Sequence, residues 1–222
     1  MTDSRLTRLG LLALAALPAC MTVRAPTHPE LATVAAQGTS LGLSDALETL
    51  IASGEDTSTD RAYALQVVRE RPADTAQEAY ARAAITGRVV QAKGLRGATL
   101  VPEIEFYAQR SRELDPNFRG GAATVLLGTL YVIAPATLLK DGDSETGLEL
   151  LEEVTTAHPE VAQNHLRLAE AYVTLHDPEP AGPHICFCLE HQSELRAEDQ
   201  RLLKGLLDDA APLPCDLPAD AQ

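Results

Sequence analysis

The sequence has no tryptophan, few aromatic residues and few basic residues, and each shortage narrows what the protein can do. Aromatic residues make up 4% of the 222 residues, and 18 Lys and Arg side chains face 32 Asp and Glu side chains, giving a formal net charge of -14. An acidic chain repels a phosphate backbone, so we expect no nucleic-acid binding. The hydrophobic fraction of 45% is that of a globular protein.

Short catalytic motifs are also missing. The sequence contains no Gly-x-Ser-x-Gly, no His-Glu-x-x-His, no phosphate-binding loop and no dinucleotide fingerprint. We therefore expect a non-enzymatic protein that uses no cofactor and no metal ion.

The longest apolar run is short and lies at the start of the chain. Residues 9–17 are uninterrupted apolar residues and glycine, and they follow Arg5 and Arg8. This pattern predicts a signal peptide over residues 1–19, and the run is about half the ~20 residues that a spanning helix needs. The sequence Leu-Pro-Ala-Cys that ends at Cys20 resembles the lipobox of bacterial lipoproteins. This resemblance implies that Cys20 is lipidated and anchors a periplasm-facing protein in the cell envelope; Met21, which is not Asp, favours the outer over the inner membrane.

The rest of the chain divides into three parts by composition. Residues 20–43 contain several prolines and glycines and are predicted to be a tether, and residues 212–222 form a Pro-rich tail. Residues 44–211 are rich in Ala and Leu at helical spacing, which predicts an all-α domain. Its expected helices span 44–52, 59–70, 74–93, 100–114, 117–134, 144–157, 160–176, 180–191 and 196–210.

Residues 120–210 resemble tetratricopeptide repeats. In that family the first helix of each hairpin carries Leu-Gly-x-x-Tyr, and the second carries small and large apolar residues at fixed offsets before a proline. The matching residues are Leu127, Gly128, Tyr131, Gly147, Leu151, Val154 and Pro159 in one unit, and Leu168, Ala169, Tyr172, Ala181, Ile185 and Cys188 in the next. The resemblance implies antiparallel helical hairpins stacked as a TPR-like superhelix.

An insertion in the first unit points to a narrower resemblance. Residues 134–143 add seven residues to the turn between its two helices. With the surrounding pattern from Gly128 to Pro159, the insertion is similar to the lipoprotein T-component family of TRAP-type transporters. That resemblance implies a periplasmic docking module for the transporter's solute-binding protein, with possible homo-oligomers. The alternative is a scaffold for envelope assembly, such as outer-membrane protein or pilus biogenesis.

Two clusters of residues could either bind a metal ion or have a structural role. Cys186, Cys188 and Cys215 are candidates for a disulfide, with Cys186 the better partner for Cys215 because Cys188 occupies a repeat position that should be buried. The alternative is a metal or redox module that uses the two histidines at 184 and 191 with Cys186 and Cys188. Asp141, Asp143 and Glu145 resemble a calcium cluster, but acidic residues at a helix start are better explained by capping.

A binding groove in such a repeat is lined by the first helices of the hairpins. The exposed positions expected there by repeat register are Thr129, Gln163, Arg167, Glu170, Thr174, Gln200 and Lys204.

Overall fold

The protein is an all-α stack of antiparallel helical hairpins, which confirms the predicted fold class. The computed structural model describes residues 24–209, 213 and 215; the predicted signal peptide, the lipidation site Cys20 and most of the Pro-rich tail lie outside them. The α-helices are α1 (Pro29–Ala36), α2 (Ser40–Ser53), α3 (Ser58–Arg69), α4 (Ala76–Lys93), α5 (Val101–Leu114), α6 (Ala122–Ile133), α7 (Ser144–Ala157), α8 (Ala162–Thr174), α9 (Ala181–Glu190) and α10 (Ala197–Asp209). Short 3-10 turns lie at Gly94–Leu100, Ala136–Leu138 and Gln192–Glu194. Within this part of the chain, no helix is both long and apolar enough to cross a membrane.

Side-chain caps set several helix starts. Thr57 and Asp60 form a reciprocal capping box at α3, and Thr75 and Glu78 form another at α4. Asp143 caps α7 by accepting a hydrogen bond from the Thr146 N–H at 2.9 Å, so this acidic residue performs the predicted capping role. Such caps satisfy amide groups that have no partner inside the helix.

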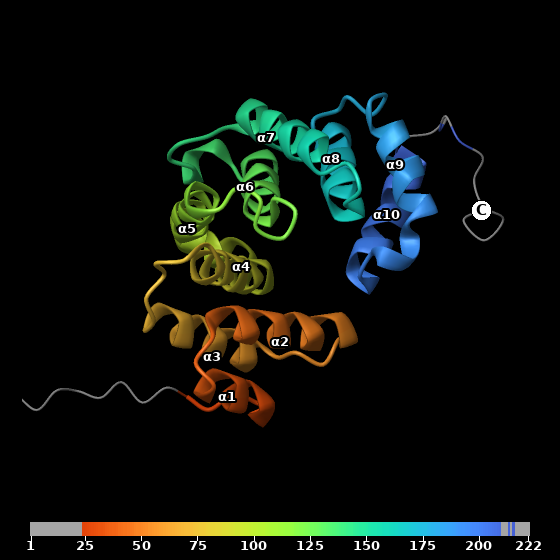
Figure 1. Cartoon of the computed structure of the whole chain (residues 1–222). Helices are drawn as coiled ribbons and strands as arrows, with labels where there is room; N and C mark the ends of the chain where they lie inside the picture. Colours follow the sequence, from red (N-terminus) through yellow and green to blue (C-terminus); the bar gives the residue numbers. More distant parts are fainter. Residues whose placement is uncertain (1–23, 210–212, 214, 216–222) are drawn as a thin grey trace, which may run out of the picture.

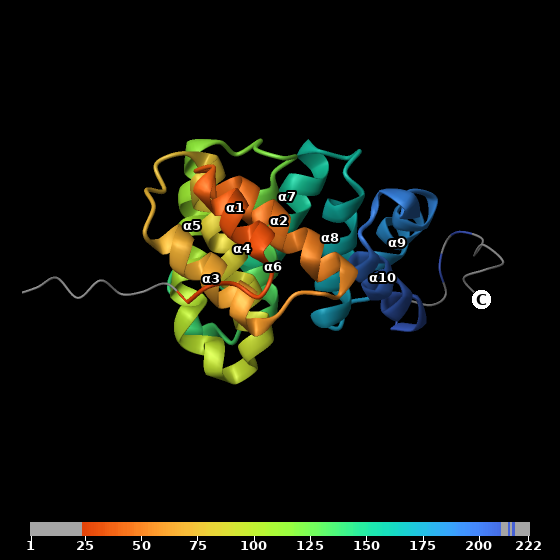
Figure 2. The ribbon, with the colours of Figure 1, turned by 90° about the horizontal axis from the view of Figure 1, so that it is seen from below.

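Consecutive helices pack as hairpins that curve into an arc. Helices α4 and α5, α6 and α7, and α8 and α9 are the most closely packed pairs, and each pair also contacts the next. Figure 1 shows this arc running from α1–α3 through α6 and α7 to α9 and α10. In the view from below, the last helices again lie beside one end of α2 (Figure 2).

Two glycines allow α6 and α7 to approach closely. A Cβ atom at Gly128 would lie 2.9 Å from the carbonyl oxygen of Gly147, and a Cβ at Gly147 would lie 2.8 Å from that of Gly128. Leu151 packs into the same contact and is fully buried. The repeat-type residues therefore perform the packing role that the sequence predicts.

Glu105 on α5 holds the inserted turn, although sequence analysis did not single it out. Its carboxylate is 1% exposed and accepts hydrogen bonds from the backbone N–H groups of Lys140 (2.9 Å) and Asp141 (2.8 Å) and from the Tyr131 hydroxyl (3.1 Å). Tyr131 is the tyrosine of the repeat pattern, and its ring also packs over Gly142. The inserted turn is thus anchored to the core by Glu105 and Tyr131, and its own residues are half-buried or exposed.

The prediction of a tether over residues 20–43 is wrong for residues 29–43. These residues form α1 and the start of α2, and Leu31 and Leu43 are fully buried in one apolar cluster with α3 and α4. Pro29 occupies the first turn of α1, where proline is compatible with a helix. The folded domain therefore begins near residue 28.

A buried carboxylate fixes this N-terminal end. Asp60 accepts hydrogen bonds from the His28 backbone N–H at 3.0 Å and from its ring Nδ1 at 2.9 Å. The hydrogen bond with Asp60 raises the pKa of His28. Burial alone would raise the pKa of Asp60, but hydrogen bonds from Thr57 and His28 outweigh it and lower that pKa to about 2.

We expect the docking of α1 to depend on pH. Because the pKa of His28 is raised on folding, protonated His28 stabilises the folded state below about pH 6.5, and this stabilisation is lost as pH rises through the folded-state pKa. Because the pKa of Asp60 is lowered on folding, ionised Asp60 stabilises the folded state above about pH 4, and this stabilisation is lost at lower pH. Protection factors for amide hydrogen exchange in α1, which correct for the intrinsic pH dependence of exchange, should therefore be highest between these limits and lower at pH 8. His28→Gln should remove the change above pH 6, and an unchanged profile in that variant would contradict the assignment.

Candidate functional site

The inner side of the arc contains a cleft of about 580 Å³. Its wall comes from α2, α4, α6 and α8, with single residues from α5 (Ile104) and from the segments just before α6 (Arg119), α8 (Val161) and α10 (Arg196). This volume is within the range of about 300–1,000 Å³ that small-molecule sites occupy. We call this space the concave cleft.

One side of the concave cleft is apolar. Val90 of α4, Ile104 of α5 and Leu126, Leu130 and Ile133 of α6 line it. Ile133 is 57% exposed, an unusual exposure for a large aliphatic side chain at the end of a helix. An apolar wall of this kind favours the binding of an apolar group.

Other residues of the cleft lining are charged, and the arginines among them are paired. Arg88, Arg119, Arg167 and Arg196 all line the cleft. Arg119 binds Asp45 of α2 through two hydrogen bonds of 2.7 Å. The cleft is therefore amphipathic, because large apolar side chains and ion-paired arginines share its lining.

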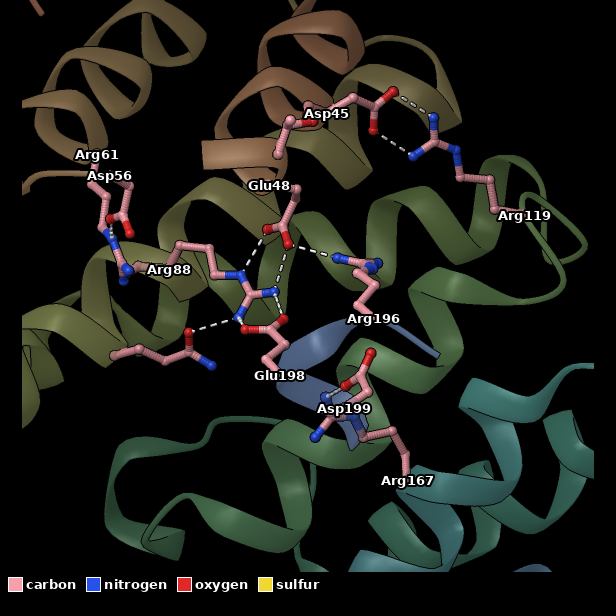
Figure 3. A network of polar contacts seen from close by, with 12 residues as sticks. Asp45, Glu48, Asp56, Arg61, Arg88, Arg119, Arg167, Arg196, Glu198 and Asp199 are labelled. Atoms are coloured by element: carbon pink, nitrogen blue, oxygen red, sulfur yellow. Dashed lines mark hydrogen bonds and ion pairs between the residues drawn. The ribbon is translucent and has the colours of Figure 1, made fainter. Parts of the chain in front are cut away.

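The largest group of ion pairs joins the two ends of the arc (Figure 3). Arg88 of α4 binds Glu48 of α2 through Nε (2.7 Å) and Nη2 (2.5 Å), and it also binds Glu198 of α10. Arg196 Nη1 donates to the same Glu48 carboxylate at 2.6 Å. We call Glu48, Arg88, Arg196 and Glu198 the closing network. Burial alone would lower the pKa of Arg88, but Glu48 and Glu198 outweigh it and raise that pKa.

A second ion pair fastens α10 to α8. Arg167 donates to the Asp199 carboxylate at 2.5 Å and to Glu170 at 2.8 Å. The Asp199 side chain is only 2% exposed. Burial raises the pKa of Asp199, and Arg167 opposes that rise. The start of α10 is thus held from both sides of the cleft.

The predicted groove residues divide into two groups. Thr129, Gln163 and Arg167 line the concave cleft, and the Thr129 hydroxyl is a buried polar atom with no hydrogen-bond partner. Glu170, Thr174, Gln200 and Lys204 lie outside the cleft lining. Gln200 instead donates to the carbonyls of residues 192 and 195 within its own hairpin. The repeat register fails at α10 because this helix closes the arc with its N-terminal end and does not line the cleft along its length.

The structure joins Cys186 to Cys215 in a disulfide with a Cα–Cα distance of 5.9 Å. The bond links α9 to the segment that follows α10. Cys188 is a free, buried thiol whose Sγ lies 3.4 Å from the carbonyl oxygen of Ala162. Burial raises the pKa of Cys188 to about 12, which disfavours the thiolate that redox chemistry needs.

The alternative metal set is not brought together. Cys186 is in the disulfide, and Cys188 faces the core. His184 instead pairs with His165 of α8, with 2.9 Å between the two Nδ1 atoms, and His191 stacks on Phe187. Among the described residues, no group of three or more His, Cys, Asp or Glu is arranged to hold a metal ion.

The sequence did not point to the closing network. Arg88 and Glu198 are 110 positions apart, and Glu48 and Arg196 are 148 positions apart. Each of these residues fits an ordinary solvated helix surface, so only the closure of the arc identifies them as partners.

Comparison with protein-family models and with curated proteins gives no match.

Proposed function

We propose that the protein is a non-enzymatic, lipid-anchored docking module of the bacterial cell envelope that serves a TRAP-type transporter by binding its solute-binding protein. The observation that carries this proposal is the amphipathic concave cleft on the inner side of a helical-repeat arc. Helical-repeat proteins bind partners on such concave surfaces. The apolar wall and paired charges of this cleft suit a partner surface with a central apolar group and a polar rim.

Several residue-level features support the narrower assignment. The glycines and Tyr131, which the T-component-like pattern shares with tetratricopeptide repeats, pack between α6 and α7, and the insertion is held by Glu105. The disulfide between Cys186 and Cys215 suits an exported protein, since such bonds persist in oxidising compartments. The proposed anchor at Cys20, the membrane that carries it and self-association are parts of the same proposal.

A site-specific cross-link tests the docking surface. A photo-crosslinking amino acid in place of Gln163 samples the concave cleft, and the same amino acid in place of Glu153 samples α7 outside it. Glu153 is 65% exposed and is a fair control for surface access. After irradiation of native envelopes, we expect a transporter solute-binding protein in adducts from position 163 and at least tenfold less from position 153.

Other outcomes would overturn the proposal. Adducts with outer-membrane or pilus assembly factors from position 163 would favour the scaffold alternative. Equal yields from the two positions would show that the cleft is not the contact surface.

A further inference from the structure

The arc is closed by charged side chains. Glu198 and Arg196, at the start of α10, reach across to Arg88 of α4 and Glu48 of α2. The side chains of Glu48, Arg88 and Glu198 are between 16% and 23% exposed, so the network is partly shielded from water.

No apolar core spans this closure in the described part of the chain. One cluster joins α1–α4, two more join α4 through α8, and the last joins α8–α10. None of these clusters contains residues of α10 together with residues of α2 or α4. Hydrophobic burial, which stabilises the other interfaces, thus contributes little where α10 meets α2 and α4.

Stacked hairpins allow such an arc to open. Each hairpin contacts mainly its neighbours, so small rotations at successive interfaces add up at the ends of the arc. Helix α10 would move with α8, to which Asp199 and Arg167 hold it. The first helices would move with α4.

We propose that the closing network is an ionic latch that holds the arc shut around the concave cleft and releases its last helices when the ion pairs are broken. Glu48, Arg88 and Arg196 also line the cleft, so release changes the width and the charge of the binding surface together. The proposal rests on the closure alone and holds whichever partner uses the cleft.

The ion pairs that Arg196 and Glu198 make can be removed while the ion pair between α2 and α4 is kept. In the double variant Arg196→Gln/Glu198→Gln, the pair between Arg88 and Glu48 remains, so α2 and α4 stay joined. The matched control is Arg112→Gln/Glu153→Gln, which removes the same charges from an exposed pair between α5 and α7. Unfolding is followed by far-UV circular dichroism, and a curve that matches the wild-type curve shows that a variant is folded.

The readout is the distance between α4 and α10 in the full chain. Donor and acceptor dyes are attached through unnatural amino acids in place of Ala92 and Lys204, two exposed positions outside the network. Single-molecule energy transfer at low salt should give one high-efficiency population in the wild type and the control. The latch variant should show at least a tenfold larger low-efficiency population. In 1 M salt, where the screening length falls to about 3 Å, the wild type should shift the same way.

The opposite results would overturn the latch. A latch variant that keeps the wild-type distance at low salt would show that packing on α8 alone fixes α10. An equal shift in the matched control would show that removing any such pair of charges changes the distance between α4 and α10, and that the closing network has no special role.

Discussion

The variant Glu105→Ala is expected to lose about 3–5 kcal/mol of unfolding free energy, one of the two largest effects that the structure predicts. The substitution removes the buried carboxylate that accepts from the part-buried N–H groups of Lys140 and Asp141, and each hydrogen-bonding group left without its partner costs about 1–3 kcal/mol. Tyr131 retains a hydrogen bond with Gln109 at 3.0 Å, so its hydroxyl adds less. Urea unfolding followed by circular dichroism measures the loss.

Two further variants test whether the loss comes from the hydrogen bonds of Glu105. Glu105→Gln keeps one acceptor oxygen but turns an amide group toward backbone donors, so we expect an intermediate loss of about 2 kcal/mol. Glu113→Ala removes an exposed carboxylate from the same helix and should change stability by less than about 0.5 kcal/mol. A loss below 1 kcal/mol for Glu105→Ala would mean that the inserted turn is not held as described.

The second large effect concerns two glycine-to-alanine substitutions that should change the unfolding free energy in opposite directions. Gly128→Ala should destabilise the protein by about 2–3 kcal/mol, because the new Cβ would meet the backbone oxygen of Gly147 at 2.9 Å and neither helix can move freely. Gly87→Ala, in the middle of α4, should stabilise it by about 0.5–1 kcal/mol. A Cβ at Gly87 meets no atom within 4 Å.

The two alanine variants are compared in the same denaturant titration. The expected midpoints lie on opposite sides of the wild-type midpoint. If Gly128→Ala were neutral, the close contact between α6 and α7 would not be a constraint, and the repeat-type glycine would have no packing role.

The helices were predictable because their signals are local. Apolar spacing and capping residues such as Asp143 act within a few positions of the helix they start. The first helix was missed because Pro29 and the nearby glycines were interpreted as breakers. In the structure Pro29 lies in the first turn of α1, and Gly42 gives room to the Thr39 hydroxyl that caps α2.

The site was predictable only in part. Thr129, Gln163 and Arg167 follow from the repeat register, because the first helices of neighbouring hairpins face the inside of the arc. The closing network depends on how far the arc curves, which is the sum of many small interhelical angles that no local pattern specifies. Glu105 was missed because a glutamate in an amphipathic helix is usually exposed, and nothing in the sequence around it marks its side chain as buried.

Blocking the concave cleft tests the account most directly. Gly87 lines the cleft and has open space around it, so Gly87→Phe places a large ring there without a backbone clash. Gly205→Phe is the matched control, since Gly205 of α10 is equally unobstructed and lies outside the cleft. The measurement is the yield of the solute-binding-protein adduct from the photo-crosslinker at position 163 in each background. We predict at least a tenfold loss for Gly87→Phe and a wild-type yield for Gly205→Phe. An undiminished yield in folded Gly87→Phe would contradict docking in the cleft.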